Sequence, residues 1–180
     1  MISQTHKDEP ENQSPSAAPP AQLLHSFPLL EYLTIILAGC ILTLSCGLLN
    51  AIALTGYFAT SVSHMTGHVA LLSLAIAKGD YSSAYHLAAV IAAFMVGAFL
   101  SGAIVGGETF MLSRRYGVVL LIESISLVGA YGFHRVKADV GTYFAGFACG
   151  LQNAMATTYS GAIIRTTHVT GTTTDIALIL

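Results

Sequence analysis

Apolar blocks separated by short polar stretches make up most of this chain. The blocks cover residues 29–57, 62–77, 83–106, 116–132, 140–164 and 168 to the end. An α-helix rises about 1.5 Å per residue, so the longer blocks reach across roughly 30 Å of membrane hydrocarbon. Because 54% of the residues are hydrophobic and only 9% are charged, the chain has too little polar surface to cover a water-soluble globule. We therefore expect an all-α, polytopic transmembrane helical bundle, without the alternating pattern of a membrane barrel.

Residues 1–27 differ from the rest of the chain. They are polar, hold four prolines, and cannot bury enough apolar surface to fold. We expect a disordered polar tail. The tail lacks a basic start followed by a short apolar core, so we expect no cleaved signal peptide and assign membrane insertion to the first apolar block.

Part of the sequence occurs twice. The run CGLLNAIA at 46–53 returns as CGLQNAMA at 149–156, and SHMTGH at 63–68 returns as THVTGT at 167–172. The offsets of the two runs differ by one residue, as one inserted residue would cause. The chain is therefore predicted to contain an internal duplication.

The duplication predicts two membrane repeats. The first, 28–137, holds about four helical segments, and the second, 138–180, is a truncated copy. If 62–77 crosses the bilayer, the second copy begins four segments after the first. Because four is an even number, both copies then run in the same direction. If 62–77 is instead a re-entrant half-helix, the copies are inverted. Basic residues do not decide the orientation, because three lie in the loops on each side.

Polar side chains at bilayer depth are the candidate functional residues. Placing such a side chain in the hydrocarbon costs on the order of a few kcal/mol of free energy, unless the side chain is paired or faces a water-filled cavity. The candidates for substrate or ion binding are Asn50, His64, Thr66, Glu123, Gln152, Asn153, His168, Thr170 and Asp175. Gly67 and Gly171 are expected at helix breaks. Small residues spaced four apart, at Gly102/Gly106 and Gly146/Gly150, are expected to let helices approach closely.

The repeated Asn and His-x-Thr-Gly elements allow two interpretations each. Asn50 and Asn153 either bond to backbone at the break before the next helix or contact a ligand. Since no proline follows Pro28, a helix break must arise from glycine or from polar side chains that satisfy freed backbone groups. Carriers expose helix ends at such breaks, and a histidine there can hold a proton. The alternative is a histidine that is hydrogen-bonded in a helix interface.

Two carboxylates raise the same kind of question. His168, Thr172 and Asp175 fall on one helical face, where a carboxylate beside a histidine suits a proton or cation relay. The first copy has Leu71 in place of Asp175. Glu123 has no obvious local partner, so it is either functional or a protonated, hydrogen-bonded residue.

Other classes of site find little support in the sequence. His64 and His68, together with the distant His168, could offer metal ligands. No residue close to the His64/His68 pair in the sequence supplies a third ligand, so no metal and no cofactor are expected. There is no nucleotide loop, no Gly-x-Ser-x-Gly and no His-Glu-x-x-His. A net charge of −2 implies no nucleic-acid partner. The three cysteines lie in apolar blocks and are interpreted as packing residues.

Three runs carry a resemblance to a known family. They are SHMTG at 63–67, GLQNA at 150–154 and RTTHVTGTTTD at 165–175. Over about 30–180 the chain resembles the YoaK family of bacterial inner-membrane proteins, a domain of unknown function. The resemblance implies a multi-pass protein of the bacterial inner (plasma) membrane that is presumed to transport small molecules, with no established substrate or catalytic residues. Similar members continue with more hydrophobic sequence, so a fragment is expected.

The function predicted from these observations is a secondary transporter or permease of a small solute, not an enzyme. The alternatives are a membrane-embedded metal-dependent enzyme and a non-transporting structural or assembly protein. The expected partners are the lipid bilayer and a small-molecule or ion substrate, with a homo-oligomer left open.

Overall fold

The computed structural model describes residues 28–57, 61–106, 113–136, 138–160 and 167–179, and this part of the chain is all-α. Its elements are α2 (Leu29–Ile52), the π-helical turn η1 (Ala53–Tyr57), α3 (Met65–Ala77), α4 (Tyr81–Val105), α5 (Arg114–His134), α6 (Ala138–Tyr159) and α7 (Val169–Ile179). The all-α prediction is confirmed, and each helix falls within a predicted apolar block or within a few residues of one. The expected disordered tail lies outside the described residues.

Among the described residues, three stretches of helix are long and apolar enough to cross a membrane. They are Leu33–Thr55, Tyr81–Val105 and Arg114–Phe133. Large apolar side chains also cover the outside of the bundle, including Phe99 and Val128, both more than 70% exposed. A water-soluble protein rarely exposes so much contiguous apolar surface, whereas lipid accommodates it. We therefore treat the chain as a membrane protein.

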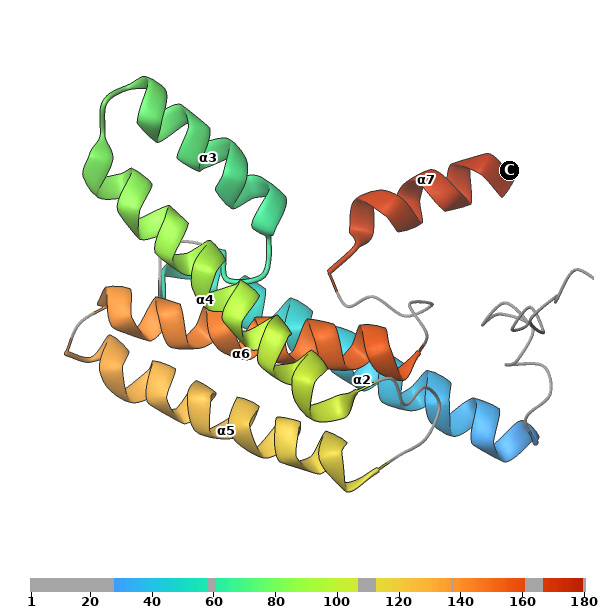
Figure 1. Cartoon of the computed structure of the whole chain (residues 1–180). Helices are drawn as coiled ribbons and strands as arrows, with labels where there is room; N and C mark the ends of the chain where they lie inside the picture. The colour runs from blue at the N-terminus through green and yellow to red at the C-terminus, as the bar shows by residue number, and fades with distance from the viewer. Residues whose placement is uncertain (1–27, 58–60, 107–112, 137, 161–166, 180) are drawn as a thin grey trace, which may run out of the picture.

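The helix α6 lies at the centre of the bundle, with α4 packed on one side and α5 on the other (Figure 1). It is not among the three apolar spans, and its sequence includes Gln152 and Asn153. Neighbouring helices cover much of α6: Ala148, Cys149 and Leu151 are at most 1% exposed. A helix that contacts protein in place of lipid can carry polar residues where those residues find partners.

The crossing of α4 and α6 depends on a glycine from each helix. A Cβ atom on Gly97 would overlap the backbone carbonyl of Phe147, and one on Gly150 would overlap the backbone carbonyl of Phe94. The two backbones are therefore in direct contact, and any side chain at either position would separate them. The sequence predicted close helix packing at Gly150, but it did not identify Gly97 as the glycine on the other helix.

The other predicted glycine pair does not pack in this way. A Cβ atom on Gly102 would meet nothing within 4 Å among the described residues. Gly106 ends α4 with a φ of 68°, in the left-handed region that glycine adopts without strain. The prediction that Gly102 and Gly106 form a helix contact is wrong for the described part of the chain, because the small-residue spacing also arises where a glycine only ends a helix.

The two helices that carry the matching sequences point in opposite directions. Along the chain, α2 runs from right to left in Figure 1, whereas α6 runs from left to right. The helix that follows α2 is short: α3 has 13 residues, which corresponds to about 20 Å. That length is less than the roughly 30 Å of a hydrocarbon core. A half-helix therefore fits α3 better than a complete span.

Candidate functional site

The first helix break is held by Asn50, near the end of α2. Its Oδ1 atom accepts hydrogen bonds from Ser61 Oγ at 2.7 Å, from the Val62 N–H at 3.2 Å and from the Ser63 N–H at 3.3 Å. Ser61 Oγ in turn accepts the His64 N–H at 2.9 Å. These backbone groups lie between η1 and α3, so they belong to neither helix and have no helical hydrogen-bond partner. The amide thus supplies the hydrogen bonds that the missing helical turns would have made.

The second matching segment uses the equivalent residue. Asn153 lies near the end of α6, and its Oδ1 atom accepts a hydrogen bond from Thr167 Oγ1 at 3.0 Å. Thr167 directly precedes His168, as Ser63 precedes His64. In both segments, therefore, an asparagine on a long helix contacts the chain just before a short helix.

The histidine and glycine of the repeated motif also contact each other in the same way in both segments. A Cβ atom on Gly67 would overlap the His64 imidazole, and one on Gly171 would overlap the His168 imidazole. Both glycines lie within the first turn of their helix and not in the break itself. Their role in this structure is to leave room for the ring of the residue three positions earlier.

The two breaks face a common cavity of about 270 Å³, here called the break cavity. It is lined by Ser63, His64, Met65, Thr66, Phe94, Asn153, Thr167, His168 and Thr170. The structure thus brings together the candidates His64, Thr66, Asn153, His168 and Thr170, although about 100 residues separate the two sets. The first turns of α3 and α7 both open onto this cavity, and the N–H groups of a first turn have no partner within their own helix. With two imidazoles and several hydroxyls, the cavity can bind a small polar solute.

His68 does not line the break cavity. Its side chain is 1% exposed, and its Nδ1 atom lies 3.0 Å from the carbonyl oxygen of His64, at the start of its own helix. His64, His68 and His168 therefore do not form a cluster of ligands. The described residues contain no group of three or more metal-binding side chains.

The remaining candidates lie elsewhere. Asp175 has an exposed side chain on α7 and does not line the break cavity, so the structure does not bring it into a site with His168. Glu123 on α5 and Gln152 on α6 are buried, and both line a second cavity, which lies between α2, α5 and α6. Apart from Asn50, which is bonded to the first break, the candidate binding residues thus divide between two cavities and an exposed position on α7.

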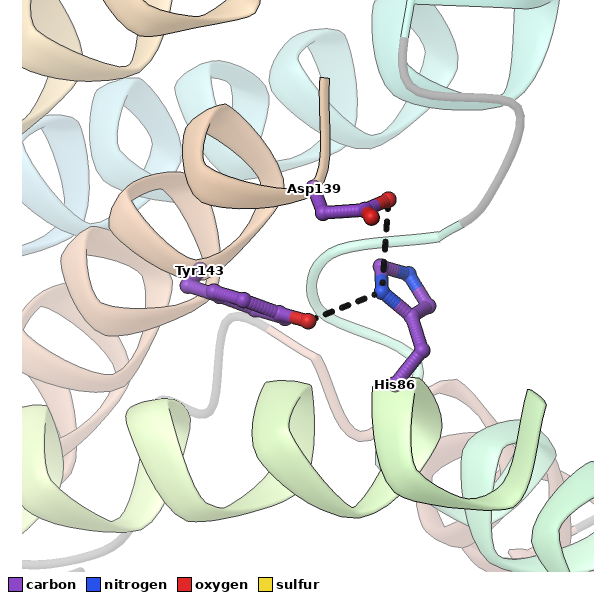
Figure 2. A network of polar contacts seen from close by, with 3 residues as sticks. All are labelled: His86, Asp139 and Tyr143. Atoms are coloured by element: carbon purple, nitrogen blue, oxygen red, sulfur yellow. Dashed lines mark hydrogen bonds and ion pairs between the residues drawn. The ribbon is translucent and has the colours of Figure 1, made fainter. Parts of the chain in front are cut away.

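A polar network that was not predicted from the sequence links the first two turns of α4 to the first two turns of α6 (Figure 2). The Nδ1 atom of His86 lies 3.1 Å from the hydroxyl oxygen of Tyr143 and 3.5 Å from Oδ1 of Asp139. His86 occurs inside a block predicted to be an ordinary apolar helix, and Asp139 is the last residue of the predicted loop 133–139. The signal that was missed is the spacing of Asp139 and Tyr143, which places both on one face of the first turns of α6.

Comparison with protein families gave a match over most of the chain. A family model described as a protein of unknown function, DUF1275, matches residues 38–180. The match includes both repeated motifs and every described helix except the start of α2. Comparison with curated proteins gave no match, and neither did comparison with solved structures.

Proposed function

We propose, starting from the finding that the chain belongs to the DUF1275 family of proteins of unknown function, that it is a secondary transporter of a small solute. Within that family we place it with the YoaK proteins, in the inner membrane of a bacterium. The observation that carries the proposal is the break cavity, where two matching interruptions of membrane helices meet.

Helix interruptions at membrane depth support a transport role. Non-helical backbone is tolerated there only where protein buries it or where it lines a wet cavity. Asn50 and Asn153 provide the hydrogen bonds that stabilise the two interruptions, and the ends of α3 and α7 open onto the break cavity. Secondary transporters bind solutes at such helix ends. A cavity of about 270 Å³ suits a solute smaller than a typical drug.

The arrangement of the copies also favours transport. We propose that the two copies are inverted relative to each other, because α2 and α6 run in opposite directions in Figure 1 and α3 is short. Inverted copies around one site allow that site to open to either side of the membrane in two related conformations. A structural or assembly protein has no need for a shared polar cavity between two helix breaks.

Solute flux in proteoliposomes tests the proposal. Vesicles with the full-length protein, and empty vesicles, are loaded with a mixture of small metabolites, and the loss of each solute is followed by mass spectrometry. We expect at least one solute to leave only the vesicles with protein. His168→Ala and Thr170→Val, which alter the lining of the break cavity, should slow that flux by about tenfold or more.

Thr174→Val is the matched control for Thr170→Val. Thr174 lies one turn further along α7, is exposed and donates to the carbonyl oxygen of Thr170 at 3.1 Å. We expect the flux of this variant to match that of the wild type. Flux of no solute, or equal flux in wild type, His168→Ala and Thr170→Val, would contradict a carrier that uses this cavity.

A further inference from the structure

The cavity between α2, α5 and α6, here called the Glu123 cavity, holds two buried polar atoms without partners. Its volume is about 620 Å³. The Glu123 side chain is 6% exposed and the Gln152 side chain 2% exposed, and both line the cavity. Glu123 Oε2 and Gln152 Oε1 have no hydrogen-bond partner among the described residues. A buried acceptor without a donor destabilises a protein, so two in one cavity point to a donor that is supplied from outside.

Neighbouring side chains do not supply that donor. Ser124 and Ser126 flank Glu123 along α5, but each hydroxyl donates to a carbonyl of its own helix, Ser124 to Leu120 and Ser126 to Ile122, both at 2.8 Å. The described residues that line the cavity include no lysine and no arginine. The carboxylate therefore has no cation of the described chain beside it in the cavity.

The walls of the Glu123 cavity restrict what the missing donor can be. Most lining residues are apolar: Ala38, Ile41, Leu42, Leu48, Leu49, Leu120, Leu127 and Met155. Tyr116 and Tyr159 also line it, with ring centroids 5.5 Å apart in an edge-to-face arrangement. Glu123 is the only carboxylate among the described lining residues, and it belongs to no group of three or more metal-binding side chains in the described part of the chain, so a bare metal ion would lack the anionic ligands it prefers. Apolar and aromatic walls instead suit an organic cation, because aromatic rings attract positive charge.

We infer that the Glu123 cavity is a binding site for an organic cation that has an apolar body and N–H donors. The positive charge pairs with the Glu123 carboxylate, one N–H donates to Gln152 Oε1, and the body contacts the aliphatic and tyrosine side chains. The volume of about 620 Å³ lies within the range of sites for drug-sized molecules. This site is separate from the break cavity and does not rest on the proposed transport of a solute there.

Ethidium binding to the purified full-length protein tests the inference, because ethidium is an apolar cation with amino groups. In detergent, fluorescence titration should show saturable binding. Glu123→Gln keeps the shape of the side chain but removes its charge, and we expect it to weaken binding by about tenfold or more. Gln152→Leu should weaken binding by roughly threefold to tenfold. Elution of each variant as the same single peak as the wild type confirms that it folds.

Two controls separate charge and hydrogen bonding from simple apolar partition. Asp80→Asn removes a carboxylate in the turn before α4, outside the cavity, and should bind ethidium as the wild type does. Tetraphenylphosphonium is a cation of similar character without N–H groups, and its binding should be insensitive to Gln152→Leu. The inference is overturned if the wild type binds no ethidium saturably, or if Glu123→Gln binds it unchanged. Equal sensitivity of both cations to Gln152→Leu also overturns it.

Discussion

A single amide oxygen organises the first helix break. Asn50 Oδ1 accepts from one hydroxyl and from two consecutive backbone N–H groups, at 2.7 to 3.3 Å. The segment that donates these N–H groups is buried, since Val62 is 1% and Ser63 9% exposed. This environment explains why an otherwise apolar helix holds an asparagine. Of the two interpretations that the sequence left open for Asn50, these contacts favour the structural one.

Replacing this amide should destabilise the protein, although Asn50 does not itself line the break cavity. Asn50→Ala leaves the N–H groups of Val62 and Ser63 unpaired inside the protein, so we expect a loss of about 1–3 kcal/mol in the free energy of unfolding. Unfolding in detergent, followed by circular dichroism, measures this loss. Thr55→Val is the control, because the Thr55 hydroxyl is exposed and donates to backbone carbonyls one turn earlier, at the end of α2. A variant Asn50→Ala as stable as Thr55→Val would show that the break does not depend on the amide.

The repeated glycines show where reasoning at the level of residues stops. Repetition drew attention to Gly67 and Gly171, and helix breaks were expected there. In the structure both glycines are helical and lie beneath an imidazole ring. The side-chain rotamer of the histidine decides this contact, and a sequence pattern carries no information about that rotamer.

At the level of elements, the crossing of α4 and α6 has the clearest prediction. Gly97→Ala and Gly150→Ala each place a Cβ atom against a backbone carbonyl that cannot rotate away. The helices must separate, and we expect each substitution to cost about 1–3 kcal/mol or more. Thermal unfolding in detergent measures the effect as a lower midpoint temperature.

Gly102→Ala is the matched control for Gly97→Ala on the same helix. Its Cβ atom meets nothing within 4 Å among the described residues. Alanine is favoured over glycine in a helix by about 0.5–1 kcal/mol, so this variant should be as stable as the wild type or slightly more stable. A similar loss of stability in Gly97→Ala and Gly102→Ala would mean that α4 and α6 do not meet at Gly97.

Most elements could be predicted from the sequence because lipid imposes a simple rule. An apolar block must be helical to satisfy its own backbone, and the blocks therefore gave α2, α4, α5 and α6 directly. The π-helical turn η1 was not predicted, since it differs from an α-helix only in hydrogen-bond register. The pairing of Gly97 with Gly150 was missed because spacing within one helix does not identify the helix it contacts.

For the whole molecule, the comparison of two sequence copies was more informative than any single motif. It selected His64, Thr66, Asn153, His168 and Thr170, which the structure places around one cavity. Comparison of the copies had no equivalent signal for His86, whose partners Asp139 and Tyr143 are more than 50 residues away and lie in no repeated motif. The differences between the copies were less informative, because Asp175 lies apart from the cavity. The spacing of Asp139 and Tyr143 indicates a shared helix face, but a single sequence does not indicate that His86 contacts that face.

The arrangement of the copies in the membrane leads to the last prediction. If α3 crosses the bilayer completely, the N-terminus lies on the same side as Lys78 and Arg135, and Arg114 lies on the opposite side. If α3 is a half-helix that leaves on the side where α2 ended, Lys78 and Arg135 lie opposite the N-terminus, and Arg114 lies with it. The 13 residues of α3 and the opposed directions of α2 and α6 lead us to expect the second arrangement.

Accessibility of single cysteines distinguishes these two arrangements. Lys78→Cys, Arg114→Cys and Arg135→Cys are each introduced into a background in which Cys40, Cys46 and Cys149 are alanine, with a tag on the N-terminus. A membrane-impermeant thiol reagent, applied to intact and then to opened vesicles, reports the side of each cysteine. We expect Arg114→Cys to react from the side of the tag, and Lys78→Cys and Arg135→Cys from the other side. Reaction of Lys78→Cys from the side of the tag would show that α3 spans the membrane. Three crossings, α3, α4 and α5, would then lie between α2 and α6, and the two copies would run in the same direction.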